Sequence, residues 1–166
     1  MPKSPSPLRC APGLNLLVAL DQVIVHQQVE LAEAILGIET SNHYVAKNAN
    51  GQFLYNIKED SSCCAKYGTG ANRCFVMDVL DNEGQVVMRF VRPLRCVYCL
   101  FFCCLQVIEV QAPPGTIIGR VRQLWSLCYP SYGIYDPSGK KALGIVGPCC
   151  TYSMPCCCTI QFTVES

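Results

Sequence analysis

The residues with the most evident chemistry are the cysteines, of which this chain of 166 residues contains fourteen. Four lie in one short run, RPLRCVYCLFFCC, at Cys96, Cys99, Cys103 and Cys104. Such thiols could be acylated, bind zinc, form disulfides or serve as small buried apolar side chains. The opening residues, MPKSPSPLRCAPG, contain no apolar signal segment, so we expect a reducing compartment and disfavour disulfides.

The cysteine run is well suited to lipid attachment. Acyl transfer to cysteine requires a thiolate, which the positive charges of Arg92 and Arg95 would favour. Each buried CH₂ of an acyl chain contributes about 0.8 kcal/mol, and stable anchoring takes two signals. Two acylated cysteines would supply them, as would one acylated cysteine with Phe101 and Phe102 at the membrane interface.

Zinc is the main alternative chemistry, although its signal is weak. Cys96 and Cys99 form a C-x-x-C pair, and further thiols occur in Cys63/Cys64, Cys149/Cys150 and Cys156–Cys158. A tetrahedral site needs two well-spaced pairs, whereas adjacent cysteines on a strand point to opposite sides. We therefore expect no metal site, while burial of the cysteines as apolar side chains stays open.

The remaining composition argues against catalysis and nucleic-acid binding. The formal net charge is +1 and only 15% of residues are charged, so no basic surface for nucleic acid is predicted. We find no G-x-S-x-G, phosphate-binding loop or carboxylate pair, so an enzyme is not expected. His26 and His43 are expected to be strand residues and Trp125 a core residue. An acidic turn is expected to be a solvated hairpin tip rather than a calcium loop: Asp78, Asp81, Asn82 and Glu83.

The elements that must position these residues are short strands joined by glycine-containing turns. Strand, turn and strand recur around Gly51, Gly84, Gly115 and Gly139, where a positive φ is expected. A short helix is predicted over 14–20. The repetition predicts a mostly β fold, an antiparallel meander that closes into a barrel or sandwich. No stretch approaches the roughly 18 residues of a membrane-spanning helix, so we expect attachment to a membrane rather than crossing.

Long stretches of the sequence resemble the phospholipid scramblase family. The most specific are DQVIVHQQVE over 21–30, RPLRC over 92–96 and LQVIEVQAPPG over 105–115. The resemblance implies a tubby-like antiparallel β-barrel around a hydrophobic C-terminal helix. It divides the chain into a flexible Pro/Ser-rich stub, residues 1–12, and a scramblase domain, residues 13–166. We expect this barrel to be incomplete, since the family's later strands, calcium-binding segment and central helix have no counterpart here.

The resemblance also implies function. Family members are credited with calcium-dependent, ATP-independent movement of phospholipids across the plasma membrane, so membrane phospholipids are the implied partners, beside possible protein partners. Matching of the family's palmitoylation run implies covalent palmitate at Cys99, Cys103 and Cys104, with Cys96 as a possible additional site. Phe101 and Phe102 would then contact the membrane from the cytoplasmic face. The alternative is a palmitoyl-anchored adaptor that binds lipid or protein without scrambling, and nucleic acid is not expected as a partner.

Overall fold

The computed structural model describes residues 11–28, 42–60, 74–95, 105–148 and 160–166. These form one short helix and ten strands, in agreement with the predicted mostly β fold. The elements are α1 (Asn15–Val18), β1 (Val23–Gln28), β2 (His43–Asn48), β3 (Phe53–Asp60), β4 (Phe75–Leu80), β5 (Val86–Arg92), β6 (Val107–Gln111), β7 (Ile117–Leu124), β8 (Ser131–Tyr135), β9 (Lys141–Val146) and β10 (Thr163–Glu165).

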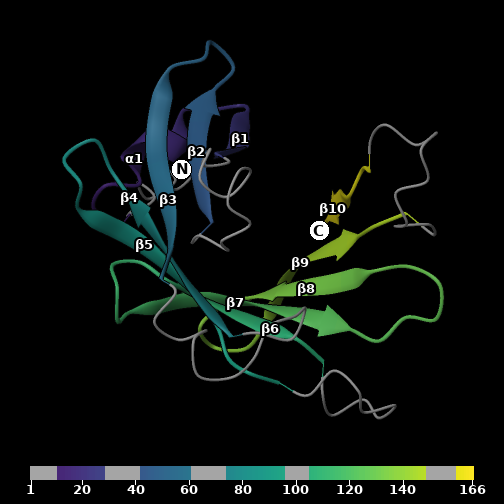
Figure 1. Cartoon of the computed structure of the whole chain (residues 1–166). Helices are drawn as coiled ribbons and strands as arrows, with labels where there is room; N and C mark the ends of the chain where they lie inside the picture. Colours follow the sequence, from purple (N-terminus) through teal and green to yellow (C-terminus); the bar gives the residue numbers. More distant parts are fainter. Residues whose placement is uncertain (1–10, 29–41, 61–73, 96–104, 149–159) are drawn as a thin grey trace, which may run out of the picture.

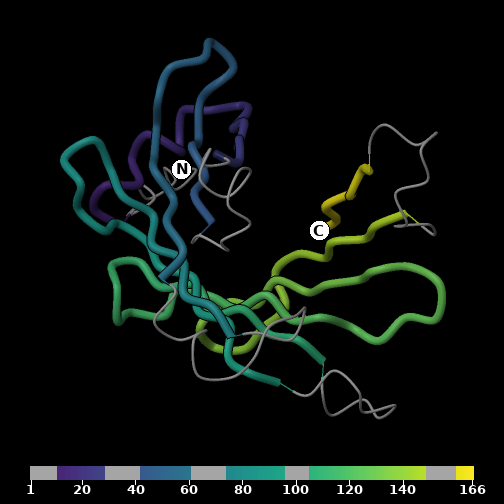
Figure 2. Tube along the Cα trace, viewed as in Figure 1, coloured from purple at the N-terminus to yellow at the C-terminus, as the bar shows by residue number. Residues whose placement is uncertain are grey.

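The ten strands form a single antiparallel sheet in which each strand pairs with its neighbours in the chain. β1 and β10 are the two edges, and they do not pair with each other, so the sheet is open. It is strongly curved: β1–β5 and β6–β10 form two arms that diverge from the middle of the sheet (Figures 1 and 2). The mostly β antiparallel meander predicted from the hairpins is therefore confirmed, and the open sheet agrees with the incomplete barrel expected from the resemblance.

The turns between strands show why these segments pair. In the turn after β2, the Asn48 side-chain oxygen accepts hydrogen bonds from the backbone N–H groups of Asn50 and Gln52, at 3.0 and 2.9 Å. Gly51 follows with φ of +78°, a conformation that a side chain would make unfavourable. The other predicted turn glycines, 84, 115 and 139, also have positive φ, so this prediction is confirmed.

One face of the sheet carries the hydrophobic core, which lies over the first arm. Directly opposed residues share a face, as Ile57, Val79 and Met88 do across β3, β4 and β5. The helix α1 packs here through Leu14, which is buried next to it. The buried cluster comprises Leu14, Ala46, Leu54, Tyr55, Val79, Val87 and Ala112.

A hydrogen bond attaches the chain before α1 to this core. The Tyr55 hydroxyl donates to the Gly13 carbonyl oxygen at 2.8 Å, and Tyr55 is only 3% exposed. Gly13 has φ of +85° and its backbone lies against the side chain of Val87. The position of α1 therefore depends on a residue without a side chain at Gly13.

The opposite face of the sheet carries charged side chains in pairs. Arg89 on β5 lies opposite Asp78 on β4, and its Nε and Nη2 atoms donate to the two carboxylate oxygens at 2.6 and 2.9 Å. The predicted placement of Asp78 in a hairpin tip is thus wrong, because Asp78 lies within β4 and only Asp81, Asn82 and Glu83 form the turn. The same face carries a second such pair in the second arm, where Glu109 on β6 lies opposite Arg120 on β7.

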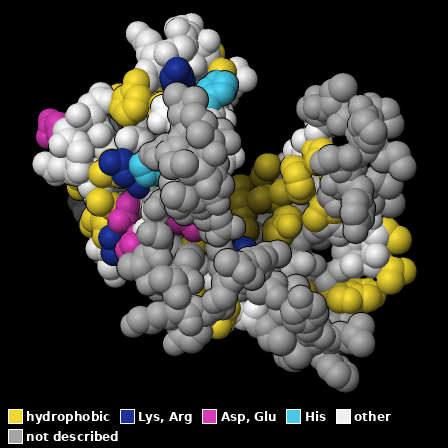
Figure 3. All heavy atoms as spheres, viewed as in Figure 1, with side chains coloured by type: hydrophobic (Ala, Val, Ile, Leu, Met, Phe, Trp, Pro, Cys, Tyr) yellow, Lys and Arg dark blue, Asp and Glu magenta, His cyan; other side chains and the backbone are white. Residues whose placement is uncertain are grey.

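Hydrophobic side chains also gather in the hollow between the two arms, as Figure 3 shows. Exposed apolar residues on the last strands include Leu143 and Val164, at 36% and 59%. The second arm is thus less well packed than the first, since the buried cluster takes nearly all of its members from residues 14–87.

Candidate functional site

The two ends of the cysteine run are held together in the structure. Arg95 follows β5 and Leu105 precedes β6, and the Nη1 atom of Arg95 donates a hydrogen bond to the Leu105 carbonyl oxygen at 3.1 Å. Residues 96–104 between them lie outside the described residues. The predicted lipid-attachment sites Cys99, Cys103 and Cys104, the additional site Cys96, and the membrane-contact residues Phe101 and Phe102 therefore stay predictions.

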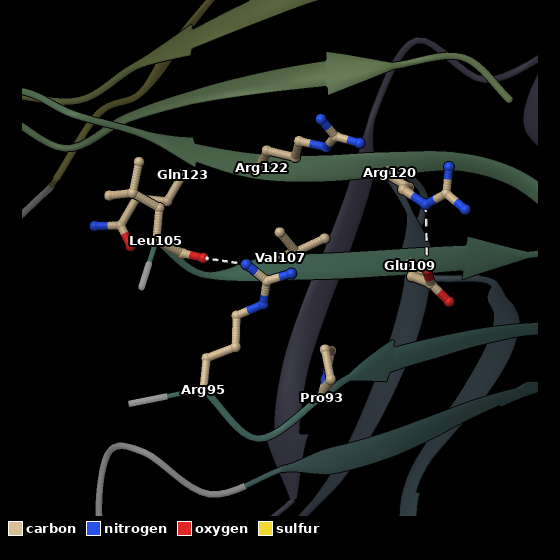
Figure 4. Close-up of a pocket in the computed structure, with 8 residues that line it drawn as sticks. All are labelled: Pro93, Arg95, Leu105, Val107, Glu109, Arg120, Arg122 and Gln123. Atoms are coloured by element: carbon tan, nitrogen blue, oxygen red, sulfur yellow. Dashed lines mark hydrogen bonds and ion pairs between the residues drawn. The ribbon is translucent and has the colours of Figure 1, made fainter. Parts of the chain in front are cut away.

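A pocket of about 370 Å³ lies directly beside this closure, between the residues after β5 and the strands β6 and β7 (Figure 4). Its lining combines three arginines with one acid, one amide and three apolar residues. They are Pro93, Arg95, Leu105, Val107, Glu109, Arg120, Arg122 and Gln123.

The strand register explains why these side chains meet. Glu109 lies opposite Arg120, and Val107 lies opposite Arg122. Because alternate residues of a strand share a face, these four side chains project from the same side of the sheet. It is the face that also carries Asp78 and Arg89. Arg95 approaches from the end of the sheet, with its guanidinium pointing toward β6 in Figure 4.

The pocket has an excess of positive charge. Arg120 Nε donates to Glu109 Oε1 at 3.1 Å, and both side chains are about one third exposed. Arg122 lies over the ring of Tyr135, 5.0 Å from its centroid, and no carboxylate in the described part of the chain forms an ion pair with it. Three guanidinium groups therefore face one carboxylate, and the site favours a negatively charged ligand.

Exposed apolar residues lie at the same end of the sheet. β5 ends, β6 begins and β7 ends there, and the backbone N–H of Gln123 donates to the carbonyl of Gln106. The segments after β5 and β7 expose large side chains: Leu94 at 49%, Trp125 at 61%, Leu127 at 83% and Tyr129 at 48%. The prediction that Trp125 belongs to the core is wrong, because the chain leaves β7 at Leu124 and carries Trp125 into the exposed loop.

The other residues singled out from the sequence give no site of their own. His26 and His43 both lie in strands, β1 and β2, as predicted. No group of three His, Cys, Asp or Glu side chains within the described ranges is arranged to hold a metal ion. Of the described cysteines, Cys74 is buried and Cys128 lies in the exposed loop after β7. In the part of the chain that the structure describes, no helix is both long and apolar enough to span a bilayer.

The pocket was not predicted from the sequence, although the spacing of two of its arginines indicates that they share a face. The segment TIIGRVRQLW places Arg120 and Arg122 two residues apart, which on a strand means one face. Their partner Glu109 follows the same period in LQVIEVQ, but its place opposite Arg120 depends on the strand register.

Comparison with known proteins gives a consistent result. The family model described as Scramblase matches residues 1–166. The chain is 47% identical to phospholipid scramblase 1 of Mus musculus and 46% identical to phospholipid scramblase 2 of Bos taurus, over all of its length and 50% and 56% of theirs. It is 45% identical to phospholipid scramblase 1 of Homo sapiens, over 52% of that protein. The chain thus spans about half the length of these curated relatives, and no solved structure matches it.

Proposed function

Since the chain belongs to the scramblase family, we propose that it takes part in moving phospholipids between the leaflets of a membrane. The observation that carries this proposal is the match of the family model across all 166 residues. Movement down a gradient needs no nucleotide, so transport independent of ATP is part of the proposal. The proposed location is the cytoplasmic face of the plasma membrane, and the partners are membrane phospholipids.

Attachment to the membrane is the second part of the proposal. We propose palmitoylation of Cys99, Cys103 and Cys104, with Cys96 as an additional acceptor, and interfacial contact by Phe101 and Phe102. Support comes from the flanking residue Arg95, whose positive charge favours a nearby thiolate. The exposed apolar residues at the same end of the sheet are a further support, because they would face the bilayer to which such an anchor is attached.

Calcium dependence would follow from the family resemblance, but the described residues do not fit a calcium site. The most acidic turn contains Asp81, whose Oδ1 accepts hydrogen bonds from the backbone N–H groups of Glu83 and Gln85, both at 2.9 Å. This oxygen closes the turn, and within the described ranges no group of three His, Cys, Asp or Glu side chains is placed to begin the set of six to eight oxygen ligands that calcium requires.

A transport assay tests the proposal directly. The purified chain is reconstituted into vesicles that contain a fluorescent phospholipid in both leaflets, and a membrane-impermeant quencher is added with and without calcium. Transport is expected to expose the inner-leaflet label to the quencher. Vesicle-bound protein that leaves the inner label protected under both conditions would support the alternative, a palmitoyl-anchored adaptor without scrambling activity.

Acyl-exchange labelling tests the anchor. Substitution of Cys99, Cys103 and Cys104 by serine is expected to remove most of the label from protein expressed in a eukaryotic cell. The matched control is Cys128→Ser, which removes an exposed cysteine that lies outside the cysteine run. Unchanged labelling in the triple variant would refute the assigned sites.

A further inference from the structure

We propose that the arginine pocket between the residues that directly follow β5 and the strands β6 and β7 binds the phosphate of an anionic phospholipid headgroup, while the exposed loop after β7 inserts into the adjacent bilayer interface. This inference deepens the proposed membrane role and rests on it for the source of the ligand. It concerns described residues alone and does not require acylation.

The charge of the pocket selects the ligand class. Arg95, Arg120 and Arg122 supply guanidinium groups, against the single carboxylate of Glu109. A guanidinium carries five N–H donors in a planar fork that matches phosphate oxygens. Arg120 uses Nε for Glu109, and Arg95 uses Nη1 for the Leu105 carbonyl, so both retain donors for a ligand.

Arg122 is the best-placed residue for direct phosphate binding. It lies on β7 two residues from Arg120, on the opposite side of β6 from Arg95 in Figure 4, and no described carboxylate pairs with it. Its stacking on Tyr135, at 5.0 Å from the ring centroid, orients the guanidinium without using its hydrogen-bond donors. A phosphate would therefore meet a pre-positioned and unneutralised cation.

The size of the pocket fits a headgroup rather than a whole lipid. Its volume of about 370 Å³ lies near the lower end of the range for small-molecule sites, roughly 300–1,000 Å³. Apolar residues form only part of the lining, at Pro93, Leu105 and Val107. Acyl chains must then remain outside the pocket, in the membrane.

The surroundings favour a lipid over a soluble phosphate. Trp125 lies two residues beyond the lining residue Gln123, and Leu127 and Tyr129 follow in the same loop. The Leu127 side chain is 83% exposed. A soluble anion in the pocket would leave this apolar side chain in water, whereas a bilayer would cover it. Trp and Tyr are enriched at membrane interfaces, where their apolar rings lie close to the headgroups. Cations beside exposed apolar side chains are the combination by which peripheral proteins bind anionic bilayers.

Vesicle binding by the full chain, expressed without acylation, tests the inference. Binding to vesicles of phosphatidylcholine with phosphatidylserine is expected to exceed binding to phosphatidylcholine alone. Arg122→Gln is expected to weaken binding to the mixed vesicles roughly fivefold, and Arg95→Gln with Arg122→Gln roughly 25-fold. Trp125→Ser with Leu127→Ser is expected to weaken binding to both kinds of vesicle.

The control removes equal charge elsewhere. Lys140 lies in the exposed turn before β9 and Lys141 is the first residue of β9, at the end of β8 that is away from the pocket residue Gln123. Lys140→Gln with Lys141→Gln is expected to retain the binding. Arg122→Lys keeps the charge without the fork and is expected to bind between wild type and Arg122→Gln, which separates binding from misfolding. Equal losses in the lysine and arginine double variants would overturn the pocket assignment.

One further outcome distinguishes a lipid phosphate from a soluble one, and another distinguishes the headgroup site from the proposed scrambling role. Inorganic phosphate that binds at Arg122 without vesicles, with no preference for phosphatidylserine vesicles, would identify a soluble ligand and overturn the lipid assignment. Specific vesicle binding by a chain that fails the transport assay would support the headgroup site while refuting the scrambling role.

Discussion

Alanine substitution at Gly13 should destabilise the fold more than the same change at any turn glycine described above. A Cβ atom at Gly13 would lie 2.3 Å from Val87 Cγ1 and 2.9 Å from Val87 Cβ, and the residue has φ of +85°. The left-handed backbone costs alanine about 1–2 kcal/mol, and overpacking of a core adds about 1–3 kcal/mol. We therefore expect Gly13→Ala to reduce the free energy of unfolding by roughly 2–5 kcal/mol.

Gly51→Ala is the matched control for the conformational part. Its φ of +78° is nearly the same, but no atom lies within 4 Å of the position of its Cβ. Only the backbone contribution of about 1–2 kcal/mol should therefore be lost. The difference between the two variants measures the clash with Val87.

Urea unfolding followed by far-ultraviolet circular dichroism measures both free energies, because the strands dominate the signal. Trp125 fluorescence is unsuitable, since this side chain is 61% exposed in the folded state. Val87→Ala removes the Cγ1 atom at 2.3 Å but keeps the Cβ atom at 2.9 Å. In that background the extra loss of Gly13→Ala over Gly51→Ala should therefore become smaller than in the wild type. Equal losses at Gly13 and Gly51 in the wild-type background would refute the clash and with it the packing of α1.

Three smaller perturbations follow from single contacts. Tyr55→Phe removes the hydroxyl that donates to the Gly13 carbonyl and should reduce the free energy of unfolding by about 1 kcal/mol in urea, whereas no change would mean that this hydrogen bond is not formed. A double-mutant cycle on Asp78 and Arg89 should give a coupling energy of about 0.5–1 kcal/mol that declines with added salt, and zero coupling at low salt would contradict the bidentate pair. Hydrogen bonds from the Ser138 hydroxyl and the Lys140 backbone N–H lower the pKa of Asp136 below 3.8. The ionised carboxylate therefore stabilises the turn before β9 at any pH above the pKa of Asp136 in the unfolded chain, and this stabilisation is lost as the pH falls through the lower pKa of the folded state. NMR titration should show that low pKa, and a normal one would contradict the turn geometry.

Local turn chemistry made the hairpins predictable from the sequence. The segment NANG contains a side chain that can accept backbone hydrogen bonds and, three positions later, a glycine for the left-handed conformation; both roles are seen at Asn48 and Gly51. The turn types and the strand ends follow from neighbours in the chain, which a sequence displays directly. The short helix predicted over 14–20 was likewise found, as α1.

Cross-strand and loop features were not predictable in the same way. Asp78 reads as part of an acidic cluster, yet the register places it opposite Arg89 and away from the turn. Trp125 follows an apolar strand and reads as core, but β7 ends one residue earlier and leaves the side chain exposed. The arginine pocket depends on the register between β6 and β7, which hydrophobic periodicity alone does not fix.

The closure of the cysteine run by Arg95 and Leu105 determines how mechanical load would enter the molecule. The membrane attachment proposed at residues 96–104 would pull β5 and β6 together and in the same direction, because β5 ends before that segment and β6 begins after it. Backbone hydrogen bonds lie across the strands, so such a pull shears the ladders to β4 and β7 rather than opening them pair by pair. Those ladders contain six and five opposed residue pairs, whereas β5 and β6 share three. Tension from a membrane would thus be resisted by the longer ladders, while the short one between the two arms is spared.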